Sequence, residues 1–243
     1  KINIKLSSSE KIERRLLTHE DPKSPISEAY RSLRTSLIFE NNQKNMSKNI
    51  MVSSSGPGEG KTTTVANLAI TYANMNKKTL LVDCDLRKPV IHKMFNLNKN
   101  FGLTNYLSNK KNKLSDIVYN SGVENLYLIP SGVVPPNPSE LLGSLQMEEF
   151  IHEISQEYDF ILFDTPPLIA VTDAMVLQKY MSKFILIVRA SGTEKGALDR
   201  VLVNLKNIDG NLDGVVFNGA DKTNSYGGGY YYNYYQYYNE SDE

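Results

Sequence analysis

The chain has 243 residues, of which 40% are hydrophobic and 22% charged, and these values are ordinary for a globular protein with a sizeable core. Its 27 basic and 27 acidic residues leave no net charge, which argues against a nucleic-acid partner because such binding needs a basic excess. The single cysteine, Cys84, excludes an intrachain disulfide and favours a reducing compartment. No apolar run reaches the roughly 18–20 residues of a membrane span.

The N-terminal segment is polar and charged up to Asp21, and we predict a linker or juxtamembrane segment over residues 1–22. It begins with Lys1 rather than Met, so it can continue a longer chain. A helix is expected next, with Ser24 as its N-cap and Pro25 at its first position. Its apolar stripe at helical spacing consists of Ile26, Tyr30, Leu33 and Leu37.

Six short apolar runs follow along the chain. Because they do not alternate with polar residues, they favour strands that are buried on both faces of a sheet. Helical patterns separate most of them, and the clearest contains Val65, Leu68, Ala69 and Tyr72. This order predicts an α/β fold with a doubly wound, mostly parallel sheet and helices on both faces, over residues 23–219. The runs are Ile50–Val52, Thr79–Val82, Leu126–Ile129, Phe160–Phe163, Phe184–Val188 and Val215–Phe217.

A rigid turn is expected at Pro135-Pro136-Asn137-Pro138. Asn137 as N-cap, Pro138 and Glu140 predict a capping-box start for the helix that follows this turn.

The composition changes after Phe217. Three glycines at 227–229 precede a stretch with almost no aliphatic residues, and eight of the fifteen tyrosines lie in the last eighteen residues. Such low complexity predicts a disordered tail over residues 220–243. Its tyrosines are Tyr226, Tyr230, Tyr231, Tyr232, Tyr234, Tyr235, Tyr237 and Tyr238.

A glycine-rich loop joins the first predicted strand to the helix that carries Val65. Its glycines let successive backbone N–H groups turn toward phosphate oxygens, and the helix N-terminus adds partial positive charge. We expect Lys61 to reach the β- and γ-phosphates of a nucleotide and the Thr62 hydroxyl to bind Mg²⁺. The strict pattern has glycine where Ser55 stands, and the alternative is a plain glycine turn. The loop reads Gly56-Pro57-Gly58-Glu59-Gly60-Lys61-Thr62.

Three carboxylates stand where predicted strands end. Asp83 and Asp85 follow the run at 79–82, and Asp164 follows the run at 160–163. The carboxyl ends of parallel strands gather at one edge of the sheet, which the glycine-rich loop also leaves, so acids and loop should converge on a metal–triphosphate. The alternatives are a strand-end cap at Asp164 and a turn in which Arg87 pairs with the other two acids. Cys84 is expected to be a small buried residue, since the neighbouring carboxylates disfavour a thiolate.

Together these motifs resemble the bacterial tyrosine kinases, the P-loop type that regulates extracellular polysaccharide synthesis and export. Each motif is common, but the set is specific, and it spans the chain from about Asp21 to its end. The matching segments are the phosphate loop at 55–62, Leu80-Leu81-Val82-Asp83-Cys84-Asp85-Leu86-Arg87, Pro135-Pro136-Asn137-Pro138-Ser139-Glu140, Asp164-Thr165-Pro166-Pro167 and the tyrosine cluster. The resemblance implies a P-loop NTPase-like fold and the cofactors ATP and Mg²⁺.

The resemblance also implies roles for single residues. Lys61, Asp83, Asp85 and Asp164 would be catalytic. Asp83 would orient or deprotonate the incoming tyrosine, and we expect orientation, because a phenol has a pKa near 10 and an aspartate one near 4. Mg²⁺ would be held by Thr62, Asp85 and Asp164, and the eight tail tyrosines would accept phosphate. ATP would contact Gly56, Pro57, Gly58, Glu59, Gly60, Lys61, Thr62 and Thr63, with Asn218 at the adenine.

An E-x-x-R-x-x-R motif of the same family is matched by Glu28, Arg31 and Arg34. At 100° per residue, the three side chains spread across the helix face opposite its apolar stripe, where they are available to a neighbouring subunit. The alternative is a solvated face with an internal Glu28–Arg31 pair. The resemblance implies a ring homo-oligomer, an octamer in this family, in which each tail enters the next subunit's site.

The function implied is an ATP-dependent protein-tyrosine kinase that autophosphorylates its tail in trans and regulates polysaccharide production. Its implied partners are a transmembrane polysaccharide co-polymerase that activates it, on the same or a separate chain, and a protein-tyrosine phosphatase. Its implied location is the cytoplasmic face of the cell membrane.

Two other functions compete with this interpretation. A P-loop ATPase that positions division or partition machinery carries a lysine early in its loop, where Gly56 stands here, and lacks a tyrosine cluster. An ATP-gated assembly module would have its tyrosines phosphorylated by another enzyme.

Overall fold

The computed structural model describes residues 16–39, 48–98, 100–109, 111–169, 173–207 and 210–220. The tail tyrosines, from Tyr226 to Tyr238, lie outside these residues.

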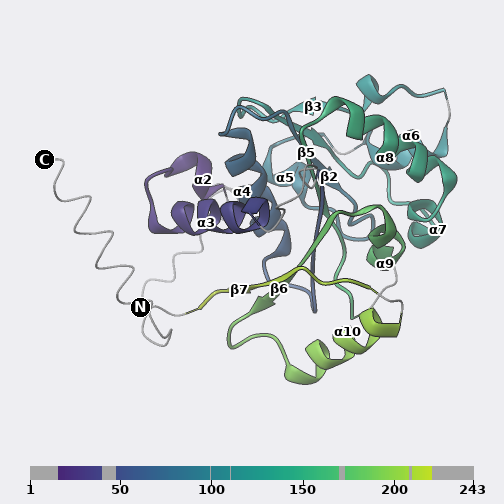
Figure 1. The fold of residues 1–243 in the computed structure, drawn as a ribbon. Coiled ribbons are helices and arrows are strands. Elements are labelled where there is room, and N and C mark those ends of the chain that lie inside the picture. The colour runs from purple at the N-terminus through teal and green to yellow at the C-terminus, as the bar shows by residue number, and fades with distance from the viewer. Residues whose placement is uncertain are drawn as a thin grey trace, which may run out of the picture.

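Seven strands of the described residues form one sheet in the order β3-β4-β2-β5-β1-β6-β7 (Figure 1). Every pair is parallel except β3 with β4, so the predicted mostly parallel sheet is confirmed. All six predicted strands are present, and β3 is additional. The strands are β1 (Asn49–Ser54), β2 (Thr79–Asp83), β3 (Tyr119–Asn120), β4 (Leu126–Ile129), β5 (Phe160–Asp164), β6 (Lys183–Arg189) and β7 (Gly214–Asn218).

Helices cover both faces of the sheet, as predicted (Figure 1). α4 packs on β1, β2 and β5 from one side, and α8 packs on β5 from the other. The helices are α2 (Leu17–Glu20), α3 (Pro25–Phe39), α4 (Lys61–Ala73), α5 (Ile91–Met94), α6 (Leu103–Ser108), α7 (Pro138–Leu142), α8 (Leu145–Glu157), α9 (Asp173–Leu177) and α10 (Lys195–Asn207), with short 3₁₀ turns η1 (Leu114–Asp116) and η2 (Gln178–Tyr180).

Side chains alternate between the two faces of a strand, and this alternation explains why the sheet has a core on each side. In β5, Phe160 and Leu162 join the apolar cluster under α4, whereas Ile161 and Phe163 join the cluster under α8. Successive side chains of a strand point to opposite faces, so a strand that is apolar at every position is stable only between two helical layers. Phe160 also contacts the ring of Tyr72 in α4, with centroids 4.3 Å apart.

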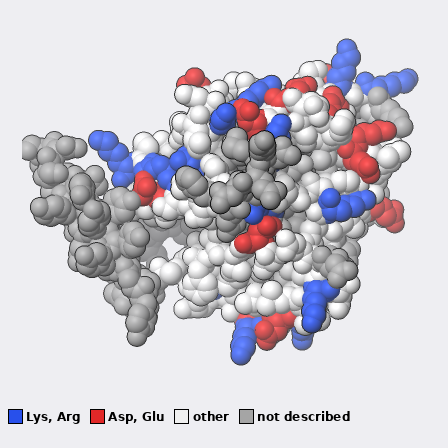
Figure 2. All heavy atoms as spheres, viewed as in Figure 1, with Lys and Arg blue, Asp and Glu red and all other residues white. Residues whose placement is uncertain are grey.

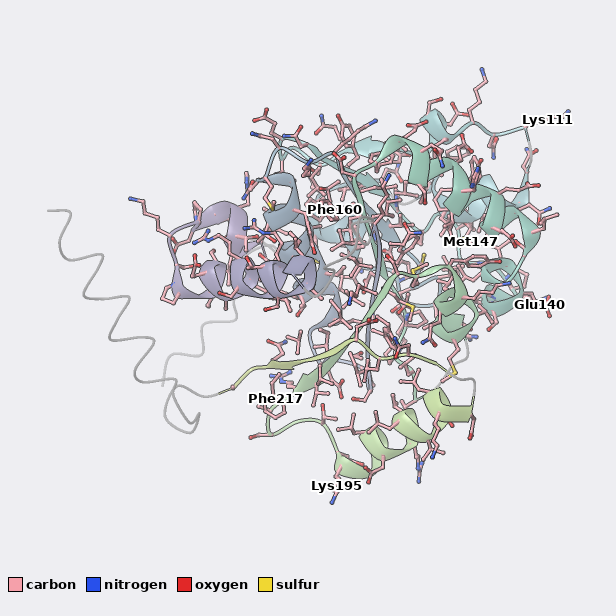
Figure 3. All side chains as sticks on the ribbon, in the orientation of Figure 1. Lys111, Glu140, Met147, Phe160, Lys195 and Phe217 are labelled. Atoms are coloured by element: carbon pink, nitrogen blue, oxygen red, sulfur yellow. The ribbon has the colours of Figure 1, made fainter. Side chains whose placement is uncertain are left out.

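β7 departs from the prediction of strands buried on both faces. It is the edge strand, and Val215 and Phe217 are 54% and 66% exposed. Phe217 lies at the outer edge of the sheet (Figure 3). The prediction was wrong for this strand because a short apolar run does not show whether a helix covers both faces.

The segment before the first predicted helix also differs from the prediction. Leu17–Glu20, expected within a linker, form α2 and pack on the domain. Thr18 is buried, and its N–H and Oγ1 donate to Asn67 Oδ1 of α4 at 3.0 and 2.9 Å. A polar residue with satisfied hydrogen bonds can dock a segment that carries little apolar signal.

Two predicted helix starts have different outcomes. Ser24 caps α3 as predicted, because its Oγ accepts the N–H of Ser27 at 3.2 Å. α7 begins at Pro138 as predicted, but no capping box forms there. Asn137 Nδ2 instead donates to the Glu140 side chain at 2.9 Å, so the two side chains bond to each other rather than to the backbone.

Ile26, predicted in the apolar stripe of α3, is 51% exposed, whereas Leu37 at the other end is buried. Among the described residues, no helix combines the length and the apolar character needed to cross a bilayer. Acidic and basic side chains are interspersed over the described part of the face in view (Figure 2).

Candidate active site

The glycine-rich loop joins β1 to α4, as predicted. Gly58 and Gly60 have φ values of +78° and +93°, which is the left-handed region that glycine adopts without strain. The first intrahelical bond of α4 runs from the N–H of Thr64 to the Gly60 carbonyl at 2.8 Å. The N–H groups of the three residues before it, including Thr63, are therefore those that an anion at the helix N-terminus would bind.

Four predicted site residues meet beside this loop. Lys61 Nζ lies 2.9 Å from Asp85 Oδ2 and 3.1 Å from Asp164 Oδ1. Thr62 Oγ1 donates to Asp164 Oδ2 at 2.7 Å. β5 lies between β1 and β2 in the sheet, so the end of each strand delivers its residue to the same place. The expected convergence of loop and acids is thus found for these four.

Lys61 and the carboxylates beside it shift one another's pKa values. Burial alone would lower the pKa of Lys61, but Asp164 and Asp85 raise it above its ordinary value, so the ammonium stays protonated. Burial raises the pKa of Asp164, and this rise is opposed by Lys61 and by the Thr62 hydroxyl. The Asp164 side chain is only 1% exposed, so its ion pair with Lys61 is screened little by solvent.

Asp83 is fully buried beside Asp164, its partner in the parallel pairing of β2 and β5. Burial, and then the charge of Asp164, raise the pKa of Asp83 well above its ordinary value. Its two oxygens accept the N–H groups of Asp85 and Ile91, each at 3.2 Å. The structure therefore shows Asp83 shaping the loop that follows β2, and its contact with a tyrosine stays a prediction.

Oxygen ligands at this place suit a magnesium ion. The Thr62 hydroxyl and the carboxylates of Asp85 and Asp164 are hard oxygen donors. Within the described residues, no group of three or more His, Cys, Asp and Glu side chains could hold a metal ion. A bound Mg²⁺ would therefore take most of its ligands from phosphate and water, as this ion does in most phosphate sites.

Asn218 reaches the phosphate loop from the end of β7. Its Nδ2 donates to the Glu59 carbonyl at 2.9 Å, and a Cβ atom on Gly60 would lie 2.1 Å from the same nitrogen. The absence of a side chain at Gly60 thus lets Asn218 approach. Its predicted contact with adenine stays a prediction.

Gly58 and Gly60 both have positive φ values, but Asn218 approaches only Gly60, so the two glycines form a matched pair for testing this contact. Gly58→Ala introduces only backbone strain, because nothing lies within 4 Å of the added Cβ. Gly60→Ala adds the same strain and also displaces Asn218. We expect Gly58→Ala to raise the dissociation constant of ATP by about thirtyfold or less, the most that strain of about 1–2 kcal/mol can cost in binding, and Gly60→Ala to raise it at least tenfold further. Isothermal titration calorimetry checks this, and equal effects of the two changes would contradict the role of the Asn218 contact.

Arg87 does not pair with Asp83 or Asp85, so the turn considered as an alternative is not formed by that ion pair. Arg87 Nε and Nη2 instead donate to the two oxygens of Asp173 in α9 at 2.7 and 3.1 Å. Ser139 Oγ donates to the same carboxylate. Burial raises the pKa of Asp173, but these hydrogen bonds outweigh it and hold the pKa below its ordinary value.

This cluster was missed by sequence reasoning, and it joins the segment after β2 to α7 and α9. Ser139 lies in a segment that carried the family resemblance, but nothing near Asp173 signalled its role. Cys84, between the two acids, is fully buried as expected, and burial followed by Asp83 raises its pKa.

The three residues of the E-x-x-R-x-x-R motif are engaged within the chain. Arg31 pairs with Glu28 and donates to the Pro22 carbonyl at 2.8 Å. Arg34, expected to be available to a neighbour, donates to the Thr71 carbonyl of α4 at 2.6 Å. α3 packs on α4, which brings Arg34 against that helix although its charge suggests a solvated face. The oligomerisation role of these residues stays a prediction.

Comparisons with known proteins agree with this geometry. Residues 47–212 match the family model described as an AAA domain, which together with the sheet and the phosphate loop defines a P-loop nucleotide-binding protein. The kinase domain of the Escherichia coli tyrosine kinase ETK is 31% identical, with a TM-score of 0.78 over 87% of this chain and 84% of that one. The chimerical protein CapA2B2 is 36% identical, with a TM-score of 0.79 over 84% and 89%.

Among curated relatives, the tyrosine-protein kinase YwqD of Bacillus subtilis is 39% identical over 91% of this chain and 92% of its own length. The chain therefore belongs to the bacterial tyrosine-protein kinases. The tyrosine-protein kinase Wzc of Salmonella typhimurium is 36% identical over 93% of this chain but only 31% of its own length. The septum site-determining protein MinD of Pyrococcus horikoshii, which represents the competing ATPase class, is 28% identical with a TM-score of 0.58.

Proposed function

We propose that this kinase transfers the γ-phosphoryl group of ATP to the tyrosines of its C-terminal tail on a neighbouring copy. The observation that supports this is the cluster of Lys61, Thr62, Asp85 and Asp164, joined by contacts of 2.7–3.2 Å at the phosphate loop. The catalytic domain would comprise residues 23–219, with α2 docked on it. The tail would comprise residues 220–243.

Catalysis rests mainly on positioning and charge neutralisation, because phosphoryl transfer passes through a loose transition state. Lys61 and the loop amides hold the phosphates, and Thr62, Asp85 and Asp164 would hold Mg²⁺. When bound, this ion supplies neutralisation of the charge that develops on the phosphates. The phenolic oxygen bonds to the γ-phosphorus while the bond to the β,γ-bridging oxygen breaks, and the phenol's proton passes to water.

The start of the tail allows transfer between copies. β7 ends at Asn218, which contacts the phosphate loop, so the tail leaves the domain beside the site. Eighteen extended residues span up to roughly 60 Å, enough to reach a neighbouring molecule. A head-to-tail contact that closes on itself makes a ring, and the family resemblance favours an octamer built with Glu28, Arg31 and Arg34.

Phosphorylation would then act as a switch on the assembly. Each phosphate adds a charge of about −1.5 to −2, so eight would add roughly −12 to −16 to a neutral chain. The resulting repulsion, with loss of tail docking, would dissociate the ring until a phosphatase resets it. A transmembrane polysaccharide co-polymerase would activate the kinase at the inner face of the membrane, and the cycle would regulate polysaccharide export. If light scattering shows that the assembly keeps its size after the tail is fully phosphorylated, the switch is contradicted.

Transfer between copies is tested by mixing two variants. One carries Lys61→Met and keeps its tail, and the other keeps its site but has the eight tail tyrosines replaced by Phe. With ATP and Mg²⁺, we expect phosphate on the tail of the Lys61→Met chain, measured by mass spectrometry. If the wild type phosphorylates itself but the mixture does not, transfer occurs within one chain.

A further inference from the structure

The phosphate loop contains a buried carboxylate whose task is not explained by phosphate binding. Glu59 is only 6% exposed, and its negative charge is unfavourable in a loop that binds anions. Burial of a charge is tolerated where hydrogen bonds satisfy it. The Glu59 carboxylate accepts three: from the N–H of Ser55 at 2.9 Å, from Ser55 Oγ at 3.1 Å and from Thr193 Oγ1 at 2.7 Å.

Thr193 lies in the connection between β6 and α10, far from the loop in sequence. Its Oγ1 also accepts the N–H of Arg189 at 2.8 Å, and Arg189 Nη1 donates to the Gly58 carbonyl at 3.0 Å. In the same connection Ser191 has a φ of +54°, a sparsely populated conformation for a residue other than glycine. The connection from Arg189 to Thr193, called here the β6 loop, is thus held in a defined shape against the phosphate loop.

The order of the strands shows which part of a nucleotide the β6 loop faces. Asp164 and Asp85 stand at β5 and after β2, on one side of β1, and they mark the end of the triphosphate that reacts. In the proposed function, the rest of the nucleotide would extend to the other side of β1, over the ends of β6 and β7. The β6 loop lies on this nucleoside side.

We propose that Glu59 is a positioning residue that couples the nucleoside side of the site to the phosphate loop through Thr193. The Glu59 carboxylate holds the amide of Ser55 at the start of the phosphate loop, and at the same time it holds the β6 loop through Thr193. Both sides are thereby arranged before ATP arrives, which strengthens binding by reducing the ordering that binding requires. This inference rests on the proposed function, in which ATP is the phosphoryl donor.

The test is a double-mutant cycle with ATP–Mg²⁺ binding as its readout. We expect Thr193→Val and Glu59→Gln each to raise the dissociation constant of ATP about tenfold, as for loss of one charge-assisted hydrogen bond. The double variant should bind no more weakly than Glu59→Gln alone, rather than about a hundredfold more weakly than the wild type, because Glu59→Gln already removes the charge that accepts from Thr193 Oγ1. Thr193→Ser, which keeps the hydroxyl, should bind within about twofold of the wild type. KM for ATP should rise in parallel, with kcat changed less than about twofold.

Several results would overturn the proposal. These are unchanged ATP binding by Thr193→Val, additive effects in the double variant, or tighter binding by Glu59→Gln, which would show that the charge of Glu59 mainly repels phosphate. A lower melting temperature with unchanged binding would assign Glu59 to packing alone. If the wild type binds ATP but does not phosphorylate tyrosine, the proposed function fails while the coupling remains measurable by calorimetry.

Discussion

Replacing Lys61 by Met is expected to reduce tyrosine phosphorylation of the tail by about a thousandfold, the upper range for loss of one group that stabilises transition-state charge. The Lys61 ammonium lies 2.9 and 3.1 Å from the carboxylates of Asp85 and Asp164 and is the positive charge that would meet the phosphates in the proposed function. The measurement is mass spectrometry of the tail after incubation with ATP and Mg²⁺, with wild type and variant side by side. Lys93→Met, at an exposed lysine of α5, is the matched control and should keep wild-type activity.

The same change has a cost in folding free energy that must be measured with it. Without Lys61, the side chains of Asp85 and Asp164, 7% and 1% exposed, lose their counter-charge. Removing one member of a buried pair costs about 3–5 kcal/mol, which urea unfolding will show. Lys61→Arg keeps the charge and separates lost stability from lost chemistry. Tail phosphorylation by purified Lys61→Met from ATP alone would show that the assigned site is wrong, and an inactive but folded wild type would favour the ATP-gated module.

Asp164→Asn is expected to lower tail phosphorylation by about a hundredfold to a thousandfold and to raise the Mg²⁺ concentration for half-maximal activity at least tenfold. Asn keeps the size of the side chain but removes the charge that accepts from Thr62 Oγ1 at 2.7 Å and pairs with Lys61. Titration of Mg²⁺ at fixed ATP measures both effects. Asp199→Asn, at an exposed position of α10, is the control. An unchanged Mg²⁺ requirement in Asp164→Asn would remove Asp164 from the metal site.

The central sheet was predictable because its signals are local. Runs such as Phe160–Phe163 are apolar at every position, and the loop that ends at Lys61 lies directly between a strand and a helix. Parallel strands place their carboxyl ends at one edge, so the meeting of Lys61 with Asp164 followed from topology. The edge position of β7 could not be predicted in this way, because the exposure of Phe217 depends on whether a helix covers the strand.

Contacts between distant segments were not predictable from the sequence. Asp173 contacts Arg87 at a sequence separation of 86 residues, and Thr193 contacts Glu59 at a separation of 134. Neither Asp173 nor Thr193 lies in a motif. The contact of Arg34 with α4 was missed for a related reason. Helical periodicity gives the face on which a side chain stands, but the neighbour that this face meets, here the C-terminal turn of α4, depends on tertiary packing.

The lone thiol at Cys84 gives this enzyme a built-in reporter of opening at its catalytic edge. It sits fully buried between two acids in the apolar cluster under α8, so this part of the domain must open before an alkylating reagent can enter. Burial and the surrounding carboxylates also keep the sulfur protonated and unreactive. The rate of modification would therefore follow local unfolding at the strand ends without any engineered label, and nucleotide that holds this edge closed would slow it in proportion to occupancy.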